Sequence, residues 1–456
     1  MRGGILFVAL LGNSRGTTEP AAAGRRRIPD FGERRDGLVP LLRNSRKTER
    51  GAKEFLARLA VRAAPFALLS LCLQASAETP TFHKDVEPIL QKRCQSCHRD
   101  GEAAPMPLLT YEQARPWARA IRASVFSGKM PPWQPDPRYG KFSNDLSLTP
   151  GEKEKLIAWV DAGAKEGDPA DAPKPAAFPE GWRIPKPDVV FEMPEDFEIP
   201  AKGALDYQYI PVATHFTEDK WVEMAEVRPG DRSVVHHAIV VIDTGTGTNN
   251  QEYLAGYAPG SSPQIWKPGQ ARLIKAGATL VFQMHYTTNG KASRDRTRLG
   301  LIFAKKPPTE RIVSMQVMEP SLTIPAGNGN FRVDASLVIT KAARLAGMRA
   351  HMHLRGKSFQ FRAVYPNGET EILLDIPKYD FNWQPYYYLE TPKVLPAGTR
   401  IECTAYFDNS ANNPFNPDSN AVIRWGPQTW DEMMIGWLDI AVPVAQERSL
   451  RGAILQ

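Results

Sequence analysis

The sequence predicts a multidomain protein in which a small all-α domain precedes two all-β antiparallel sandwiches. Its 456 residues allow roughly two to four domains, and a hydrophobic content of 42% is ordinary for soluble globular proteins. Helix start and stop signals occur between residues 82 and 165. After residue 185, short runs of β-type residues separated by turn signals predominate. About 270 residues of such runs favour two sandwiches over one.

The first 77 residues are predicted to be a basic leader that ends in a secretory signal peptide. They carry 14 Lys and Arg against 6 Asp and Glu, so the rest of the chain has a formal net charge of −1 and lacks the excess of cations that a nucleic-acid partner needs. Arg58 and Arg62, the apolar run 63–73 and the small residues 75–77 are typical of a signal peptide, and the run is too short to span a bilayer. We therefore expect a periplasmic or secreted protein with no nucleic-acid partner and no stable membrane span.

The cysteines predict a covalently attached haem. Apart from Cys72 in the leader, the chain has Cys94, Cys97 and Cys403, which are too few for a disulfide framework. Cys94 and Cys97 belong to a CxxCH motif, in which two thiols form thioethers with haem vinyl groups and the histidine, here His98, is an axial iron ligand. A redox or zinc-binding CxxC pair is the alternative. Cys403 is expected to be an inert buried thiol.

Helix signals around this motif predict a cytochrome c-like haem domain at 78–165. Residues 82–94 are predicted to form the helix that leads into the motif. Two further helices are predicted from their capping residues, which are Thr110 with Gln113, and Thr149 with Pro150, Glu152 and the stop signal Gly163.

Met130 is the predicted sixth ligand of the haem iron. It lies in the loop GKMPPW between two predicted helices, like the Met-Pro of small c-type cytochromes. Met106 is the alternative ligand. His83 is interpreted as a surface or capping residue, because His98 already fills one axial position.

The β region follows a linker at 166–185 that is rich in Pro, Ala and charged residues. We place the boundary between the sandwiches near Pro307-Pro308, which gives sandwiches at 186–306 and 307–443 and a tail at 444–456. The runs that predict strands are, in chain order, SVVHHAIVVID, ATLVFQMHYTT, TRLGLIFAK, NFRVDASLVIT, SFQFRAVYPNGETEILLDI, TRIECTAYFDN and DEMMIGWLDIAV.

Two histidines lie two residues apart in a predicted strand over 346–359. Side chains at i and i+2 of a strand share a face, so His351 and His353 are expected to point the same way. Such a pair can offer two neutral imidazoles to one metal ion, or form a cross-strand polar pair without a metal.

The other histidines of the β region also cluster, except His215. His236 and His237 are adjacent, and His285 follows on a later predicted strand. Adjacent strand residues face opposite sides, so binding of both to one ion requires a bulge, a strand end or strong twist. Because every buried imidazole needs its own hydrogen-bond partner, scattered core histidines would not cluster at strand positions, and the pattern favours a metal.

These motifs, in this order, resemble the copper type II, ascorbate-dependent monooxygenases, the family of peptidylglycine alpha-hydroxylating monooxygenase and dopamine beta-monooxygenase. An HH pair, an HY, an HxH and an Asp-Glu-Met follow one another over roughly residues 186–443. The fold that the resemblance implies is two jelly-roll-like sandwiches facing each other across a solvent-filled cleft. By the same resemblance two copper ions are held by two sets of side chains, His236, His237 and His285 in one, and His351, His353 and Met433 in the other.

The ligand types suit copper better than zinc. A thioether with two imidazoles accommodates Cu(I) and leaves an open position, whereas three imidazoles suit a copper that only transfers electrons. Zinc, the alternative metal, is more usual with carboxylate or thiolate ligands. In the family, as the resemblance implies, the His-His-Met copper activates dioxygen to hydroxylate a C–H bond, so His351, His353 and Met433 are the predicted catalytic set. Met433 as a plain core residue is the alternative.

The sequence also departs from its relatives. Arg349 stands where the peptide-hydroxylating members have an arginine that holds the substrate carboxylate, and a structural cation is the alternative. Met434 replaces a disulfide-forming cysteine of those relatives. Ile435 and Trp437 replace an asparagine and a tyrosine that contact the peptide there. We therefore expect a small organic substrate rather than a glycine-extended peptide.

The sequence thus predicts an exported copper-dependent monooxygenase that binds two copper ions and one haem c. Its expected partners are dioxygen, a small organic substrate, and ascorbate or a redox protein as the electron donor. We expect the fused haem to be the entry point of the electrons. A non-catalytic electron-transfer or copper-binding protein is the alternative function.

Overall fold

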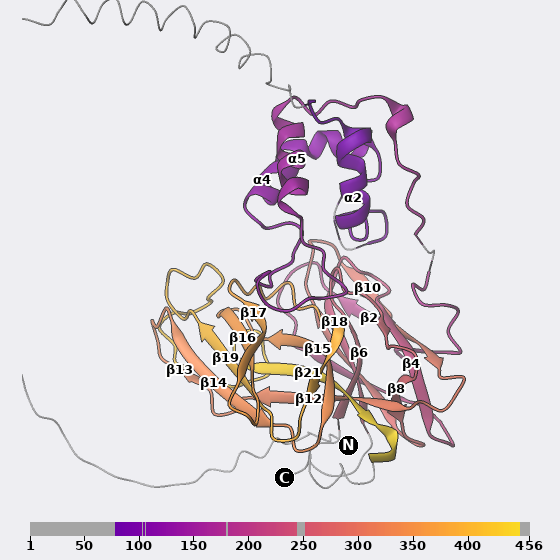
Figure 1. The fold of residues 1–456 in the computed structure, drawn as a ribbon, viewed down its shortest axis with the longest axis vertical. Coiled ribbons are helices and arrows are strands. Elements are labelled where there is room, and N and C mark those ends of the chain that lie inside the picture. Colours follow the sequence, from indigo (N-terminus) through magenta and orange to yellow (C-terminus); the bar gives the residue numbers. More distant parts are fainter. Residues whose placement is uncertain (1–77, 103, 105, 179–180, 244–250, 447–456) are drawn as a thin grey trace, which may run out of the picture. The chain divides into compact units, whose positions relative to one another are not determined.

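The computed structural model describes residues 78–102, 104, 106–178, 181–243 and 251–446. The predicted leader and signal peptide, and most of the predicted tail, lie outside these residues. From Glu78 onward the chain forms one compact unit, so the predicted boundaries of the haem domain, linker and sandwiches all fall within it. The described part consists mainly of β-sandwich sheets with few helices, as predicted (Figure 1). None of its helices has the length and apolar character needed to cross a membrane.

Helices begin at both predicted capping residues, Thr110 and Thr149, and one precedes the CxxCH motif as expected. The helix expected after Thr110 is divided into three short pieces, and the helical turns at 169–171 and 444–446 were not predicted. The helices are η1 (Phe82–Val86), α2 (Glu87–Arg93), α3 (Tyr111–Ala114), η2 (Arg115–Trp117), α4 (Ala118–Phe126), α5 (Pro150–Asp161) and η3 (Pro169–Asp171), with η4 (Val444–Gln446) at the other end of the described chain. At the start of α5 the side chain of Thr149 accepts the N–H of Glu152, and the Glu152 side chain accepts the N–H of Thr149. Two of the otherwise unpaired N–H groups of the first turn and its cap are thereby satisfied.

His83 of η1 contacts carboxylates with both ring nitrogens. Its Nδ1 lies 2.8 Å from Oε2 of Glu87, and its Nε2 lies 3.5 Å from Oε1 of Glu166. The hydrogen bond to Glu87 raises the pKa of His83 above its ordinary value of 6.5, while burial opposes the rise. These contacts fit the predicted surface or capping role and leave neither nitrogen facing an iron.

We expect His83→Asn to destabilise the protein by about 1 kcal/mol near pH 5.5 and by much less near pH 9. A group whose pKa is raised by folding contributes its stability below the unfolded pKa of 6.5, and that contribution is lost as the pH rises through the folded pKa. Melting temperatures of wild type and variant at the two pH values measure the effect. His215→Asn is the matched control, because His215 is exposed and its φ of 55° suits asparagine. An equal loss at both pH values would contradict the assignment.

Strands account for more of the described chain than helices do. They are β1 (Val189–Glu192), β2 (Phe197–Ile199), β3 (Gln208–Ala213), β4 (Lys220–Arg228), β5 (Val235–Asp243), β6 (Gln251–Tyr257), β7 (Gln264–Ile265), β8 (Gln270–Ile274), β9 (Thr279–Tyr286), β10 (Ser293–Asp295), β11 (Arg298–Phe303), β12 (Glu310–Met318), β13 (Thr323–Ile324), β14 (Phe331–Val338), β15 (Ala343–His351), β16 (Gly356–Val364), β17 (Thr370–Ile376), β18 (Tyr387–Leu395), β19 (Arg400–Phe407), β20 (Ile423–Arg424) and β21 (Ile435–Pro443). Every run that predicts a strand contains one of them.

Two hydrophobic cores lie on either side of the predicted boundary near Pro307-Pro308. In the first, the sheet β3-β9-β5-β6 packs against β4 and β11, and Phe282 and Leu301 belong to the same buried cluster. In the second, the sheet β14-β19-β16-β17 packs against β15 and β21, and Phe361 and Leu438 belong to the same buried cluster. Alternating burial along β5 and β19 is the period-2 pattern expected of strands with one face in a core.

The two cores share one nine-stranded sheet, in the order β1-β11-β4-β8-β12-β21-β15-β18 with β7 attached to β4. A short parallel pairing of β8 with β12 joins the two halves of this sheet. The alternation of apolar and polar residues in the sequence does not predict this pairing. Beside it, Nη2 of Arg272 lies 2.8 Å from Oδ1 of Asp439, and both side chains are at most 2% exposed. Because loss of one partner would leave a buried unpaired charge at a cost of about 3–5 kcal/mol, this ion pair holds the junction together.

The strand predicted over 346–359 is wrong in extent. β15 ends at His351, and β16 starts only at Gly356. Between them the backbone N–H of Met352 donates to the hydroxyl of Tyr379, and the N–H of His353 donates to Oε2 of Glu432. The two N–H groups therefore bond to side chains instead of a neighbouring strand, and the ladder stops.

Cys403 is fully buried in the second core, as predicted. Its side chain packs beside Gly436, where an added Cβ would lie only 2.6 Å from Sγ of Cys403 and 2.7 Å from the ring of Phe361. Burial raises the pKa of the Cys403 thiol well above its ordinary value. The thiol is therefore unreactive, and β21 needs glycine at position 436 to approach β19 and β16.

Candidate metal centres and haem-attachment motif

A bulge in β5 brings three histidines together. His237 pairs with His285 of β9, and the register shifts between Val235 and His237, so His236 is an extra residue without a partner opposite. This is the bulge that binding of adjacent histidines to one ion requires. One ring nitrogen from each of the three side chains lies within 4.8 Å of the others.

The three rings turn the same nitrogen toward one another. Nδ1 of His236 lies 3.1 Å from Nδ1 of His237 and 3.2 Å from Nδ1 of His285. These separations are close to the ~3.3 Å between two ligand atoms that each lie about 2.0 Å from a tetrahedral ion. The far sides are held by other residues: Nε2 of His236 faces Oδ1 of Asn382 at 3.3 Å, and Nε2 of His285 faces Oγ1 of Thr429 at 3.4 Å. A proton on each Nε2 leaves the Nδ1 lone pairs free for a metal.

Burial keeps these imidazoles neutral. It lowers the pKa of His285 to about 3 and the pKa of His236 below its ordinary value, and it places that of His237 well below 6.5. Tyr207 stacks on the ring of His285 with centroids 4.6 Å apart. Neutral, fixed imidazoles are what a metal needs as ligands near pH 7.

The second set of predicted ligands lies where β15 ends. The rings of His351 and His353 are perpendicular with centroids 5.1 Å apart, so the pair comes together although it does not share one strand. Nδ1 of His351 lies 2.7 Å from Oε1 of Gln384, and Nδ1 of His353 lies 3.2 Å from the carbonyl oxygen of Asp431. An N–H at Nδ1 donates in both cases, so Nδ1 is not the nitrogen that these two rings would offer to a metal.

Glu432 ties Met433 to this pair. Its Oε2 accepts the backbone N–H of His353 at 2.8 Å and that of Met433 at 3.3 Å, and its Oε1 accepts the N–H of Arg355 at 2.6 Å. Met433 also lies two residues before Ile435, which pairs with His351 across β21 and β15. Burial raises the pKa of Glu432 to about 8. The structure thus brings the backbone of Met433 beside the predicted two-histidine set.

The segment Phe381–Gln384, which precedes β18, contacts both histidine sets. The ring of Phe381 stacks on His236 with centroids 5.2 Å apart, and it lies 6.1 Å from His353. Asn382 faces His236, and Gln384 faces His351. The sequence did not predict a role for these residues, because an aromatic and amide-rich stretch between two strands carries no metal signal of its own.

Arg349 lies in a pocket of about 170 Å³ whose wall also includes His236, His237 and His351. Its guanidinium lies 5.2 to 5.5 Å from three ring centroids, those of Tyr253, Tyr386 and Trp437. The residue is 8% exposed, and within the described part of the chain its Nε has no hydrogen-bond partner. A buried cation that faces three aromatic rings can receive an anionic group that enters the pocket.

The CxxCH motif forms a turn after α2 at the other end of this pocket. The N–H groups of Cys97 and His98 donate to the carbonyl oxygen of Cys94 at 3.0 and 2.9 Å. Cys97 lines the same pocket as His236 and His237. An added Cβ on Gly260 would lie 3.4 Å from Sγ of Cys97 and 3.9 Å from the ring of Trp383, so the motif approaches the histidine-bearing sandwich closely.

A hydrogen bond also orients the ring of His98. Its Nδ1 lies 3.2 Å from the carbonyl oxygen of Met106, so Nδ1–H donates and Nε2 is free. Burial raises the pKa of the Cys94 thiol to about 12 and raises that of Cys97. Met130 follows α4, and its N–H donates to the carbonyl oxygen of Ser124 at 3.2 Å.

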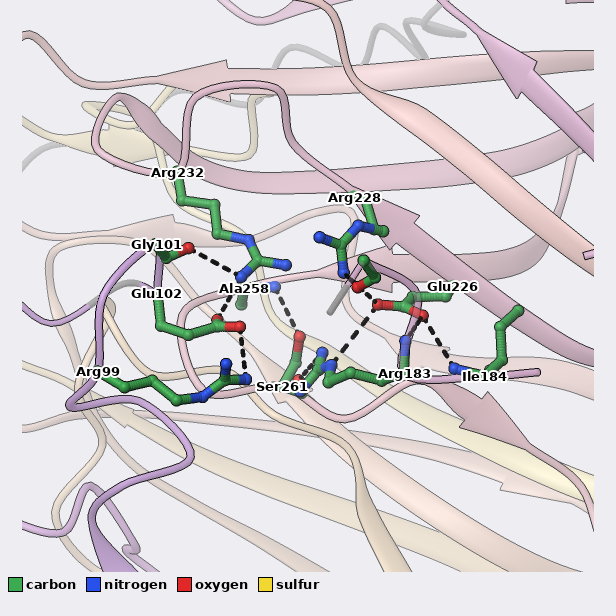
Figure 2. Close-up of polar contacts among 11 residues, drawn as sticks. Arg99, Gly101, Glu102, Arg183, Ile184, Glu226, Arg228, Arg232, Ala258 and Ser261 are labelled. Atoms are coloured by element: carbon green, nitrogen blue, oxygen red, sulfur yellow. Dashed lines mark hydrogen bonds and ion pairs between the residues drawn. The ribbon is translucent and has the colours of Figure 1, made fainter. Parts of the chain in front are cut away.

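A network of arginines and glutamates fixes the motif loop against the sandwich (Figure 2). Glu102, four residues after His98, pairs with Arg99 at 2.8 Å and with Arg232. Nη1 of Arg232 also donates to the carbonyl oxygen of Gly101 at 3.1 Å. Arg232 lies four residues before His236, so the network joins the loop after the motif to the loop before β5.

A second carboxylate anchors the end of the predicted linker in the same region (Figure 2). Oε2 of Glu226 in β4 accepts the N–H groups of Arg183 at 2.6 Å and Ile184 at 3.2 Å. Nη2 of Arg183 donates to the carbonyl oxygen of Ser261 at 2.7 Å. The end of the linker is therefore bound to the loop that contacts Cys97.

Most of the predicted site residues thus line or adjoin one region. Three histidines converge through Nδ1, two more lie beside the backbone of Met433, and Cys97 and Arg349 line the pocket next to them. His215 lies apart on the surface, as expected. Among the described residues, the three converging histidines form a group that could hold one metal ion.

No family model matches the sequence, and no curated protein matches it. Solved structures with partial likeness include one described as the STIV MCP, with 7% identity, 56% of this chain and 98% of that chain covered, and a TM-score of 0.26. Others are the infectious bursal disease virus Gx strain, with 8% identity, 59% and 75% covered and a TM-score of 0.17, and a Paenibacillus xanthan lyase, with 10% identity, 60% and 28% covered and a TM-score of 0.16. At these TM-scores the likeness carries no argument about fold or function.

Proposed function

We propose that this protein is an exported copper-dependent monooxygenase with a fused c-type haem domain. The observation that carries the proposal is the opposite orientation of the two histidine sets: His236, His237 and His285 converge through Nδ1, whereas His351 and His353 use Nδ1 for hydrogen bonds to the protein. In four of the five histidines, the ring nitrogen that is not the proposed ligand atom makes a hydrogen bond. Core histidines have no need of such an arrangement.

The residues fit copper. The Nδ1 separations of 3.1 and 3.2 Å suit ligands of one small ion, and in the second set a thioether from Met433 would join two imidazoles. When bound at His351, His353 and Met433, copper would supply the one-electron chemistry that lets dioxygen hydroxylate a substrate C–H bond. Insertion of one oxygen atom and release of the other as water consumes two electrons and two protons, which ascorbate or a redox protein must provide.

The chain's own residues would bind and orient the substrate beside this set. Arg349 precedes His351 by two residues and has no ion-pair partner among the described residues. The rings of Tyr253, Tyr386 and Trp437 around it keep water away, which strengthens its attraction for a carboxylate. We infer that the substrate is a small organic molecule with an anionic group.

The motif residues fit a haem rather than a redox or zinc pair. A redox or zinc-binding CxxC pair has no use for the histidine that follows it here, whereas a haem takes that histidine as an axial ligand. The Nδ1–H of His98 donates to a backbone carbonyl, which is the usual way to orient an iron-ligating imidazole. That carbonyl belongs to Met106 and lies beside Nδ1. The iron would bind Nε2, and its sixth ligand would lie on the far side of the haem from His98. Met130 is therefore the better candidate for the sixth ligand.

The test is to quantify copper and iron together on protein isolated from a host able to attach haem, and then to measure oxygen uptake with ascorbate. We expect two copper ions and one haem per chain, and uptake that a panel of small organic carboxylates stimulates in wild type but not in Arg349→Gln. Copper and haem without stimulated uptake would instead favour the non-catalytic electron-transfer role. Zinc in place of copper would contradict the proposal.

A further inference from the structure

The segment Phe381–Gln384 is the feature of the pocket that no predicted role explains. It lies between β17 and β18 and supplies neither a histidine nor a methionine. Yet three of its four side chains touch histidines of the two proposed copper sites. A role for this segment rests on the proposed function, because it takes both sets as copper ligands.

Asn382 acts on the three-histidine set. Its Oδ1 lies 3.3 Å from Nε2 of His236, and its own amide Nδ2 donates to Oδ1 of Asp380 at 3.0 Å, which leaves the oxygen facing the ring. An acceptor at that place keeps the proton on Nε2 and the lone pair on Nδ1. Without it, the ring can flip or protonate the nitrogen that the metal needs.

Gln384 does the same for the two-histidine set. Its Oε1 lies 2.7 Å from Nδ1 of His351, and its Nε2 donates to the carbonyl oxygen of Phe381 at 2.9 Å. The amide is therefore oriented by the segment's own backbone. It holds the proton on Nδ1 of His351 and leaves Nε2 as the ligand, which is the opposite choice from that at His236.

Phe381 packs against both sets. Its ring stacks on His236 with an interplanar angle of 19°, lies 6.2 Å from His285, and meets His353 edge-on at 6.1 Å. Because both rings lie next to Phe381, the distance between the ring centroids of His236 and His353 cannot exceed the sum of 5.2 and 6.1 Å. The space between the two sets is therefore partly filled by an aromatic side chain, in contrast to the solvent-filled cleft that the resemblance implies.

We propose that Phe381–Gln384 is a shared positioning segment for two metal sites, in which Asn382 sets the ring of His236, Gln384 sets the ring of His351, and Phe381 packs against both sets. Neighbouring residues then have separable effects. Loss of the Asn382 amide weakens copper at the three-histidine set alone, loss of the Gln384 amide weakens copper at the other set alone, and loss of the Phe381 ring weakens both.

The experiment measures Cu(I) affinity by anaerobic competition with a chromophoric chelator, on the full chain, with each site studied alone. The three-histidine site is isolated in a chain carrying His351→Ala and His353→Ala, and the other site in a chain carrying His237→Ala. We expect Asn382→Leu and Gln384→Leu each to lower the affinity of its own site by about 10- to 100-fold, which is typical for loss of a hydrogen bond to a ligating imidazole. Phe381→Leu, which keeps bulk but removes the flat ring, should lower both affinities.

Conservative variants separate positioning from a merely structural role. Asn382→Asp and Gln384→Glu keep the acceptor oxygen and should restore near-wild-type affinity. A second measurement is the electron paramagnetic resonance spectrum of the Cu(II) form with only the three-histidine site occupied. This spectrum should change in Asn382→Leu but not in Gln384→Leu. Asn367→Leu is the matched control, because its amide oxygen accepts the N–H of Glu369 in a turn of another hairpin. Unchanged affinities, or equal losses at both sites from all three residues, would overturn this inference alone. Absence of copper from both sites of the wild type would overturn the proposed function with it.

Discussion

Replacing His237 by alanine is expected to lower the copper content from two ions per chain to one. His237 pairs with His285 beside the β5 bulge, and its Nδ1 lies 3.1 Å from that of His236, so its loss leaves two imidazoles where three converge. The second ion should remain, because its ligands come from the end of β15, the loop after it and the loop before β21. Metal analysis of the purified variant measures this directly.

Met433→Ala is expected to have the complementary effect. It removes the thioether from the His351 and His353 set, so Cu(I) binding there should weaken and hydroxylation should fall to background, while the three-histidine ion is retained. Met318→Ala is the matched control, because Met318 is exposed and pairs with Ile435, close to Met433 in the same sheet. A normal metal count and full activity in both His237→Ala and Met433→Ala would reject the assignment of the two sites.

Local signals in the sequence predict those features that a few neighbouring residues determine. The capping box depends only on two positions, Thr149 and Glu152, and it occurs as predicted. The need for a bulge at His236 follows from the alternation of side chains along a strand, whatever the partner strand is. Alternation likewise predicts β5 and β19, because each has one face in a core.

Features that depend on distant partners could not be predicted in this way. The strand predicted through His351 and His353 breaks because Tyr379 and Glu432, far away in the sequence, take the N–H groups of Met352 and His353. The aromatic surroundings of Arg349 come from β6, β21 and the residue just before β18. The sequence of one strand does not indicate which side chains the neighbouring strands present. The sequence therefore predicts the ligand residues but not the residues that orient them.

Replacing Cys94 and Cys97 by alanine is expected to abolish turnover with a redox protein as the electron donor, while turnover with ascorbate persists. The reason is the place of the motif. Cys97 lines the same pocket as His236 and His237, and the Glu102–Arg232 pair holds the motif loop against the loop before β5. A haem attached there would face the three-histidine set within one compact unit, which turns delivery of electrons into an intramolecular event.

The acceptor of those electrons can be identified by following the haem band after oxygen and substrate are added to the reduced protein in a stopped-flow instrument. We expect fast reoxidation in wild type and much slower reoxidation in His237→Ala, because the variant keeps its haem but lacks the three-histidine copper. Met433→Ala should behave differently, since its three-histidine copper can still accept one electron from the haem even though hydroxylation is lost. Equal reoxidation rates in wild type and His237→Ala, or undiminished turnover with a redox-protein donor after loss of both cysteines, would show that electrons enter by another route and that the haem domain serves a different partner.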